Sequence, residues 1–193
     1  LSACSCRLFI GEKPIPSQTI EDLSTEITED ELKEAFIDEW GVKYSKDGRK
    51  LLKVPKELSG AYSVKEGTRV ICNCAFFCCR SLSDIVIPSS VTSIGNRAFL
   101  SCLSLSKIVI PSSVTSIGDS AFFWCRSLSD IVIPSSVTSI GVSAFRCCDS
   151  LSKIVISSSV TSIGKGAFCY CKFPDNLRKE LISQFGYKIF SSW

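Results

Sequence analysis

Cysteine is the residue with the clearest capacity for chemistry in this sequence, which contains twelve cysteines and no histidine. Thiolates bind zinc and form disulfides, and the segment Cys72-x-Cys74-x3-Cys78-Cys79 is dense enough to raise both possibilities. This segment lacks the paired C-x2-C knuckles of structural zinc sites, so no metal site is predicted. Five cysteines recur instead at intervals of 23 residues: Cys79, Cys102, Cys125, Cys148 and Cys171.

The regular spacing of these five cysteines predicts a buried structural column. Cysteine behaves as a small hydrophobic residue, and side chains stacked in one direction are badly oriented for disulfide formation. We therefore expect free thiols in this column. The other cysteines remain candidates for disulfides whose connectivity the sequence does not give: Cys4, Cys6, Cys72, Cys74, Cys78, Cys147 and Cys169.

The missing histidines also restrict enzymatic function. Without histidine there is no Ser-His-Asp or Cys-His nucleophile pair and no histidine-containing zinc site. Lys, Asp, Glu, Tyr and Cys form no recognisable catalytic constellation. We predict no catalytic residue and no cofactor, which makes an enzyme the least favoured class.

Charge and hydropathy limit the partners in a similar way. With 22 Lys and Arg against 19 Asp and Glu, the net charge is +3, too small to indicate a nucleic-acid partner. The longest apolar runs have the length of strands, far below the roughly 20 residues of a membrane-spanning helix.

The first four residues, Leu1-Ser2-Ala3-Cys4, resemble a bacterial lipoprotein cleavage box, in which the cysteine is lipidated. Cys4 is therefore a candidate lipid anchor and the one predicted route to a membrane, while the alternative is an ordinary N-terminus. Because the chain contains no methionine, we expect a processed product or a piece of a longer protein.

A period of 23 residues organises the second half of the chain. It is visible in Leu82, Leu105, Leu128 and Leu151, and again in Gly95, Gly118, Gly141 and Gly164. A fixed repeat of 20 to 29 residues with regular leucines is the mark of a leucine-rich repeat solenoid, in which coils bury their apolar faces against one another.

One repeat gives the expected course of each coil. Leu82, Ile85 and Ile87 alternate as in a strand, and Pro88 ends it. Gly95 then permits a tight or positive-φ turn, and Ala98, Phe99 and Cys102 lie on one face of a single helical turn. The sequence predicts one strand, one turn and one helical turn per coil.

The recurring pattern I-V-I-P-S-S-V-T-S-I-G-x-x-A-F-x-x-C-x-S-L-S closely resembles the BspA-like, or Treponema pallidum type, family of leucine-rich repeats. The resemblance covers Ser59 to Cys171 as a degenerate first unit and four near-identical ones. Departures are Cys72 at the glycine position, Lys65 and Ser157 at the proline position, and Gly67 where later units have serine. The resemblance implies bacterial surface proteins and adhesion to host or neighbouring-cell proteins.

Amphipathic segments flank the repeats. Thr28 to Glu31 forms a capping box, followed by a predicted helix that presents Leu32, Phe36, Ile37 and Trp40 and ends at Gly41. An Asp47-Gly48 hairpin signal lies between 42–44 and 51–54.

At the other end, Pro174 and Asp175 introduce a predicted helix that Gly186 ends, with a strand over 187–190. The expected organisation is an N-terminal segment (1–27), a helix and hairpin cap (28–58), five repeats (59–171) and a helix and strand cap (172–193).

Two surfaces compete as binding sites. On the strand face, Asp84, Val86, Pro88 and their equivalents are expected to project outward, and one repeat position alternates in charge through Asp84, Lys107, Asp130 and Lys153. We favour register-setting and solubility over ligand recognition for these charges. The 16 residues from Arg80 to Gly95 recur unchanged from Arg126 to Gly141.

On the helical-turn side the copies differ, which leaves those positions available for a specific role. The candidate binding residues there are Phe77, Leu100, Phe123, Trp124 and Tyr170. Phe123 and Trp124 are either interface anchors or side chains that pack on adjacent coils, and the sequence leaves both interpretations open.

The sequence thus predicts a non-enzymatic, cell-surface or secreted protein-binding module whose ligand it does not identify. The alternative is a structural or spacer segment of a larger surface protein. We expect a monomer.

Overall fold

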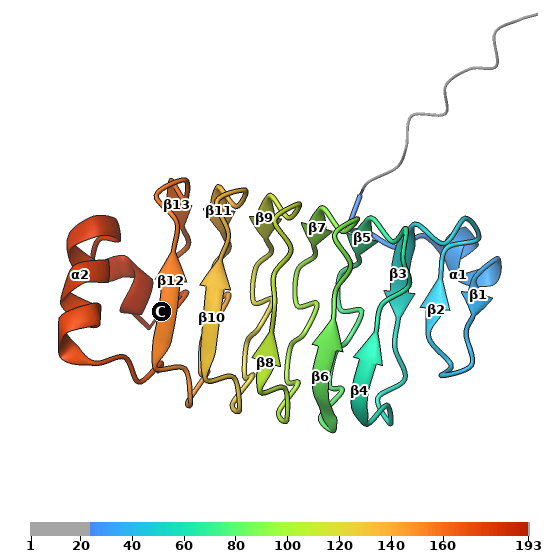
Figure 1. The fold of residues 1–193 in the computed structure, drawn as a ribbon, viewed down its shortest axis with the longest axis horizontal. Helices are drawn as coiled ribbons and strands as arrows, with labels where there is room; N and C mark the ends of the chain where they lie inside the picture. The colour runs from blue at the N-terminus through green and yellow to red at the C-terminus, as the bar shows by residue number, and fades with distance from the viewer. Residues whose placement is uncertain (1–23, 193) are drawn as a thin grey trace, which may run out of the picture.

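The computed structural model describes residues 24–192 as a solenoid of five coils with a cap at each end (Figure 1). Each coil has three sides: a first strand, a second strand and a side made of turns. The leucine-rich repeat solenoid predicted from the sequence is confirmed, and neighbouring coils are offset by 23 residues.

The first strands form the strand face, which runs along the front of the view in Figure 1. Its members are β4 (Gly60–Ser63), β6 (Leu82–Val86), β8 (Lys107–Ile108), β10 (Asp130–Ile133) and β12 (Lys153–Ile156). All pairings are parallel, within a three-stranded sheet β4-β6-β8 and a two-stranded sheet β10-β12. Pro88 and Pro111 are buried rather than directed outward, because the chain already turns inward there towards Val91 and Val114.

A second strand in each coil corrects the prediction of one strand per coil. These strands are β5 (Val70–Ile71), β7 (Ser93–Ile94), β9 (Ser116–Ile117), β11 (Ser139–Ile140) and β13 (Ser162–Ile163). They join β1, β2 and β3 in one eight-stranded sheet. Two residues are too short to show a period of two in the sequence, so the strand exists through pairing with neighbouring coils.

The third side, which we call the turn side, is not the predicted helical turn. Phe99 N donates to Ala121 O of the next coil (2.7 Å), whereas Cys102 N donates to Phe99 O (3.2 Å). Backbone donors thus alternate between the next coil and the residue three positions back. The alternation needs left-handed residues, such as Ser101 (φ 63°) and Trp124 (φ 62°), which a helix excludes.

Phenylalanine and cysteine columns fill the core behind the turn side. Rings of Phe76, Phe99, Phe122, Phe145 and Phe168 stack with centroids 4.7–5.6 Å apart. Beside them, four repeat cysteines donate their Sγ proton to a carbonyl of the preceding coil, as Cys125 does to Phe99 O (3.2 Å), and Cys79 donates to Pro55 O of the N-terminal cap (3.5 Å). The column cysteines are buried free thiols, as their spacing predicts.

The repeat glycines are required because consecutive coils approach closely there, not because the backbone has a positive φ. Gly95, Gly118, Gly141 and Gly164 have no left-handed backbone. A Cβ on Gly118 would lie 2.6 Å from the carbonyl carbon of Gly95 and 2.7 Å from Asn96 N. Only glycine allows consecutive coils to approach this closely. Cys72 occupies the same position in the first coil, where its side chain packs with Leu52 and Val70 beneath the N-terminal cap.

The N-terminal helix is much shorter than predicted. α1 (Glu29–Lys33) has the expected capping box, with Thr28 Oγ1 accepting from Glu31 N (3.1 Å), but it ends at Lys33 instead of Gly41. Phe36–Ile37 is strand β1, antiparallel to β2 (Lys43–Tyr44). Long-range pairing with β2 overrides the local helical pattern, and the supposed apolar face is exposed: Leu32, Phe36, Ile37 and Trp40.

The predicted hairpin is present. β2 pairs antiparallel with β3 (Lys50–Lys53) around Gly48, whose φ of +74° fits the Asp-Gly signal. β3 then pairs in parallel with β5, so the hairpin continues the eight-stranded sheet beyond the first coil.

At the C-terminal end, α2 (Asp175–Phe185) lies where the sequence predicts a helix, and Gly186 (φ 80°) follows it. The predicted strand over 187–190 is instead a 3-10 helix, η1 (Tyr187–Phe190). Gly166 N and Phe168 N donate to Lys188 O and Ile189 O, both at 2.8 Å. η1 therefore supplies the acceptors that a further coil would provide, which a helical segment can do as well as a strand.

Candidate binding surfaces

Trp124 and Phe123 form the largest aromatic feature of the turn side. Their ring centroids are 5.2 Å apart, and the Trp124 side chain is 42% exposed, whereas Phe123 is partly buried. The Arg126 guanidinium lies 5.8 Å from the centre of the Trp124 ring. Trp124 is thus accessible to solvent, and the partly buried Phe123 ring lies against it at a tilt.

A small hollow of about 160 Å³ lies beside Trp124, lined by Arg80, Ser101, Leu103, Trp124 and Arg126. Arg80, Leu103 and Arg126 occupy the same repeat position in three successive coils. The lining of the hollow therefore combines an indole, an aliphatic side chain and two arginines. Such a set can receive an aromatic or carboxylate side chain of another protein.

The same side carries two further aromatic–cation pairs. Lys56 Nζ lies 5.7 Å from the Phe77 ring centre, and the Arg146 guanidinium lies 5.4 Å from that of Tyr170. Phe77 is 38% exposed and Tyr170 is 60% exposed, whereas Leu100 is partly buried.

These pairs are separated along the solenoid instead of gathering around Trp124. Trp124 and Tyr170 stand at the same repeat position two coils apart, which at about 4.8 Å per strand spacing is roughly 10 Å. Both are left-handed residues (φ 62° and 65°). The structure thus aligns the turn-side candidates in two adjacent columns, one with Phe77, Leu100 and Phe123 and one with Trp124 and Tyr170, but does not bring all of them into one cluster.

The strand face carries two rows of exposed side chains. The charged row is Asp84, Lys107, Asp130 and Lys153, and the valine row is Val86, Val109, Val132 and Val155. The predicted register is confirmed, since Asp84 pairs with Lys107 and Asp130 pairs with Lys153 across neighbouring strands. Within the part of the chain that the structure describes, no ion pair joins members of the charged row.

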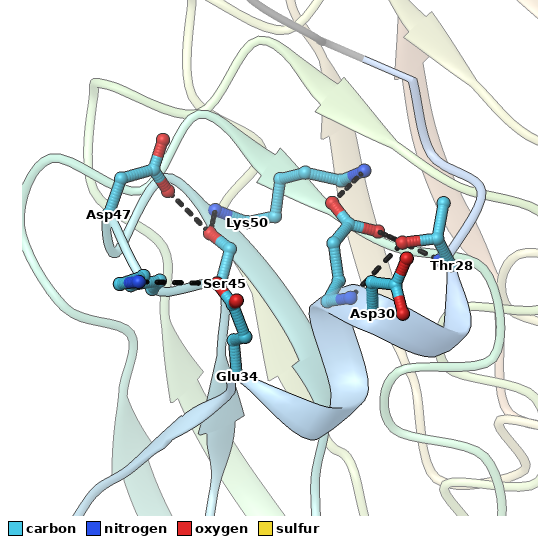
Figure 2. A pocket seen from close by; sticks show the side chains of 8 residues that line it. Thr28, Asp30, Glu34, Ser45, Asp47 and Lys50 are labelled. Atoms are coloured by element: carbon cyan, nitrogen blue, oxygen red, sulfur yellow. Dashed lines mark hydrogen bonds and ion pairs between the residues drawn. The ribbon is translucent and has the colours of Figure 1, made fainter.

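A larger cleft of about 470 Å³ opens between α1 and the β2–β3 hairpin (Figure 2). Its lining is mostly charged: Thr28, Asp30, Glu31, Glu34, Ser45, Lys46, Asp47 and Lys50. Lys50 Nζ is buried and contacts Glu31 Oε1 (2.7 Å) and Glu26 O (2.9 Å). Sequence reasoning did not single out this cleft, because a five-residue helix and a hairpin over ten residues away create it.

The charges of this cleft are satisfied internally. Burial alone raises the pKa of Glu31, but hydrogen bonds from Lys50 and Thr28 outweigh it and hold the pKa below its ordinary value. Glu34 pairs with Lys46 (3.3 Å), and Asp47 accepts from Ser45 Oγ (2.6 Å). These contacts hold α1 against the β2–β3 hairpin within the N-terminal cap.

The described cysteines differ in exposure between the column and the positions off it. Burial raises the pKa of Cys79 and of Cys125 to about 12, so the column thiols are protonated at neutral pH. Off the column, Cys74 is exposed, Cys78 and Cys147 are half-buried, and Cys72 and Cys169 are buried. Cys74, Cys78, Cys147 and Cys169 are free thiols, and Cys4 and Cys6 lie outside the described residues.

Neither a metal site nor a membrane span is found over 24–192. Within that range no three His, Cys, Asp or Glu side chains are grouped to hold a metal ion. Its helices are also too short and polar to cross a membrane.

The sequence profile of the BspA type leucine rich repeat region matches residues 61–192 in six copies. The chain belongs to this family. The matched region extends past Cys171 and includes η1, where Lys188 and Ile189 take the place of a further coil. No curated protein matches the chain.

Solved structures of bacterial leucine-rich repeat proteins show the same fold. The chain is 29% identical to a leucine rich cell surface protein of Faecalibacterium prausnitzii (TM-score 0.70), covering 83% of this chain and 44% of that one. The pneumococcal vaccine antigen PcpA is 18% identical (TM-score 0.65), with 83% and 48% covered. The leucine rich repeat protein of T. pallidum is 23% identical (TM-score 0.57), with 82% and 96% covered.

The chain therefore spans less than half of the first two of these proteins. It corresponds to a repeat region that in such relatives is accompanied by further sequence.

Proposed function

We propose that this BspA type repeat region is a non-enzymatic protein-binding module of the cell surface or of a secreted protein. The observation that carries the proposal is the exposed Trp124 residue, which lines a hollow together with Arg80 and Arg126. Tryptophan and arginine are the residues most enriched at the energetic centres of protein interfaces. They stand at positions where the repeats differ, so selection for repeat packing does not explain them.

The chemistry of the hollow indicates the kind of partner. Two guanidinium groups beside an indole favour a protein segment that combines a carboxylate with an aromatic or aliphatic side chain. Arg126 already contacts Asp149 Oδ2 (3.4 Å), and these side chains are 57% and 42% exposed. A partner carboxylate can exchange with Asp149 at small cost, since exposed ion pairs contribute at most about 1 kcal/mol.

The relatives support a location at the cell surface, because one is described as a cell surface protein and another as a vaccine antigen. Adhesion to a host protein or to a protein of a neighbouring cell follows as the specific role that we propose. A lipid on Cys4 would provide attachment.

The test compares Trp124→Ser with Trp40→Ser, a second exposed tryptophan that lies in the N-terminal cap. Serine is compatible with the left-handed backbone at position 124, because Ser101 holds the same conformation in the preceding coil. Both variants should keep the unfolding free energy within about 1 kcal/mol of wild type.

Immobilised wild type, both variants and the double variant Phe123→Ser/Trp124→Ser would be exposed to extracellular-matrix proteins and to surface proteins of neighbouring bacteria. We expect a saturable partner of wild type whose affinity falls at least 10-fold with Trp124→Ser and is unchanged with Trp40→Ser. Wild type that binds nothing saturably would instead support the spacer interpretation. A partner retained by Trp124→Ser would refute the turn side as its binding surface.

A further inference from the structure

The strand face combines charge and exposed apolar surface in a regular way. Along four successive coils the charged row reads acidic, basic, acidic, basic. The valine row beside it has exposed fractions of 63%, 78%, 60% and 60%. Four exposed β-branched residues in line form an apolar strip of the kind that marks interaction sites.

Within the described residues, the side chains of the charged row form hydrogen bonds to neighbouring serines but no ion pairs. Asp84 accepts a hydrogen bond from Ser83 Oγ (2.8 Å), and Asp130 accepts one from Ser129 Oγ (2.9 Å). Although strand pairing places Lys107 beside Asp84, the two side chains form no ion pair in the described structure. Both signs therefore remain available to a partner.

The order of the charges along the row indicates a second copy of the same chain as the partner. Acidic, basic, acidic, basic becomes its own complement when it is read in the reverse direction. A second copy that faces the first with its solenoid reversed would therefore present the opposite sign at every charged position.

We propose that two copies of this chain pack strand face to strand face with antiparallel solenoids. The two-fold axis lies in the interface, parallel to the strands, and passes between β8 and β10. Asp84 then faces Lys153 of the other copy, and Lys107 faces Asp130. The same operation places Val86 opposite Val155 and Val109 opposite Val132, so the valine rows meet each other.

The other face-to-face dimer is disfavoured by the same charges. A two-fold axis along the solenoid would place each coil opposite the same coil of the second copy. Asp84 would then approach a second Asp84, or else each charge would lie over a valine. Like charges in contact repel, and burying an unpaired charge against an apolar side chain is costly.

The size of the face predicts a weak dimer. Four strands at about 4.8 Å spacing, with two outward rows about 7 Å apart, offer roughly 300 Å² per copy. A standard interface uses about 800 Å² per partner, so we expect half-dissociation at about 0.1 to 1 mM in low salt. Association of this strength becomes effective where many copies are held together, as on a cell surface. It replaces the monomer expected from the sequence and leaves the turn side open.

Two double variants of identical composition and net charge test the arrangement. Lys107→Asp/Asp130→Lys gives the order acidic, acidic, basic, basic, which is still complementary to its reverse. Asp84→Lys/Lys107→Asp gives basic, acidic, acidic, basic, which places like charges opposite each other throughout. The first variant has more like-charged neighbours within its own sheet, so a loss of fold stability would affect it more than the second.

The measurement is sedimentation velocity over a concentration series up to about 1 mM in low salt, with a reductant because Cys74 is exposed. We expect wild type and Lys107→Asp/Asp130→Lys to show a concentration-dependent rise in sedimentation coefficient, and Asp84→Lys/Lys107→Asp to remain monomeric. Val109→Ser/Val132→Ser should weaken the dimer at least 10-fold.

A monomeric wild type throughout the series, or identical behaviour of the two charge variants, would overturn the proposal. Thermal unfolding checks that each variant is folded. Trp124→Ser should dimerise like wild type, which separates this result from the test of the turn side.

Discussion

Gly118→Ala gives the sharpest test of why the coils stack as they do. The added Cβ would lie 2.6 Å from the Gly95 carbonyl carbon and 2.7 Å from Asn96 N, whereas carbon atoms in favourable contact are about 3.5–4.0 Å apart. The two nearest atoms belong to the backbone, so no side-chain rotation relieves the overlap.

The size of the expected loss in unfolding free energy follows from the separation of the coils that the added Cβ requires. Separating the coils by about 1 Å costs overpacking strain of roughly 1–3 kcal/mol or more. It also stretches the hydrogen bond from Gly118 N to Ile94 O (3.1 Å) and that from Asp119 N to Asn96 Oδ1 (2.8 Å), each worth about 1 kcal/mol. We expect a loss of about 3–5 kcal/mol in unfolding free energy and a fall in Tm of roughly 6–20 °C.

Urea unfolding followed by circular dichroism measures this loss, and Gly118→Asn identifies its cause. Asparagine tolerates a left-handed backbone but has the same Cβ as alanine. If the close approach of the coils is the reason for glycine, Gly118→Asn should lower the unfolding free energy as much as Gly118→Ala. Gly48 is the control, since it has a φ of +74° and nothing within 4 Å of an added Cβ. At Gly48, asparagine should be better tolerated than alanine. A Gly118→Ala loss below about 1 kcal/mol, or rescue by asparagine, would refute the reasoning.

Two further predictions concern the side chains that connect neighbouring coils. Asn96 Oδ1 accepts a hydrogen bond from Asp119 N, and Asp119 Oδ1 accepts one from Val142 N (2.7 Å). The series ends at Val142, because its side chain has no acceptor. Val142→Asn should raise the unfolding free energy by about 0.5–1.5 kcal/mol, whereas Val142→Leu, which adds no acceptor, should not. Burial raises the pKa of Cys125 to about 12, so its contribution to stability is complete below the pKa of the unfolded thiol, about 8.5, and declines as the pH rises towards 12. Iodoacetamide at pH 8 should accordingly label Cys74 in the native protein and Cys125 only after unfolding; rapid native labelling of Cys125, or a stability that is flat from pH 8 to 11, would contradict this.

The binding residues were predictable individually but not as a site. Phe123 and Trp124 stand out in the sequence because they are bulky at positions where the copies differ. The hollow beside them also needs Arg80, Leu103 and Arg126, which come from three successive coils. The sequence shows that these three residues share one repeat position. It does not show that their side chains reach the surface beside Trp124, which the structure supplies.

One segment in each cap differs from its prediction for another reason. The pattern from Leu32 to Trp40 fits a helix, yet Phe36 pairs with Tyr44 in a sheet. Similarly, Tyr187–Phe190 was expected to be a strand and is a 3-10 helix whose carbonyls accept from the last coil. Local propensity is weak compared with the hydrogen bonds that the end of a solenoid must satisfy.

The sequence by itself determined the repeat, its 23-residue register and its buried columns, because identical coils can bury their apolar residues only by stacking in phase. It thereby also fixed the order of charges along the strand face. Only the tertiary structure decided that each coil has two strands and that the repeat glycines allow consecutive coils to approach closely. It also decided which residues of the turn side have a left-handed backbone. Those features depend on contacts between coils, which a local pattern does not contain.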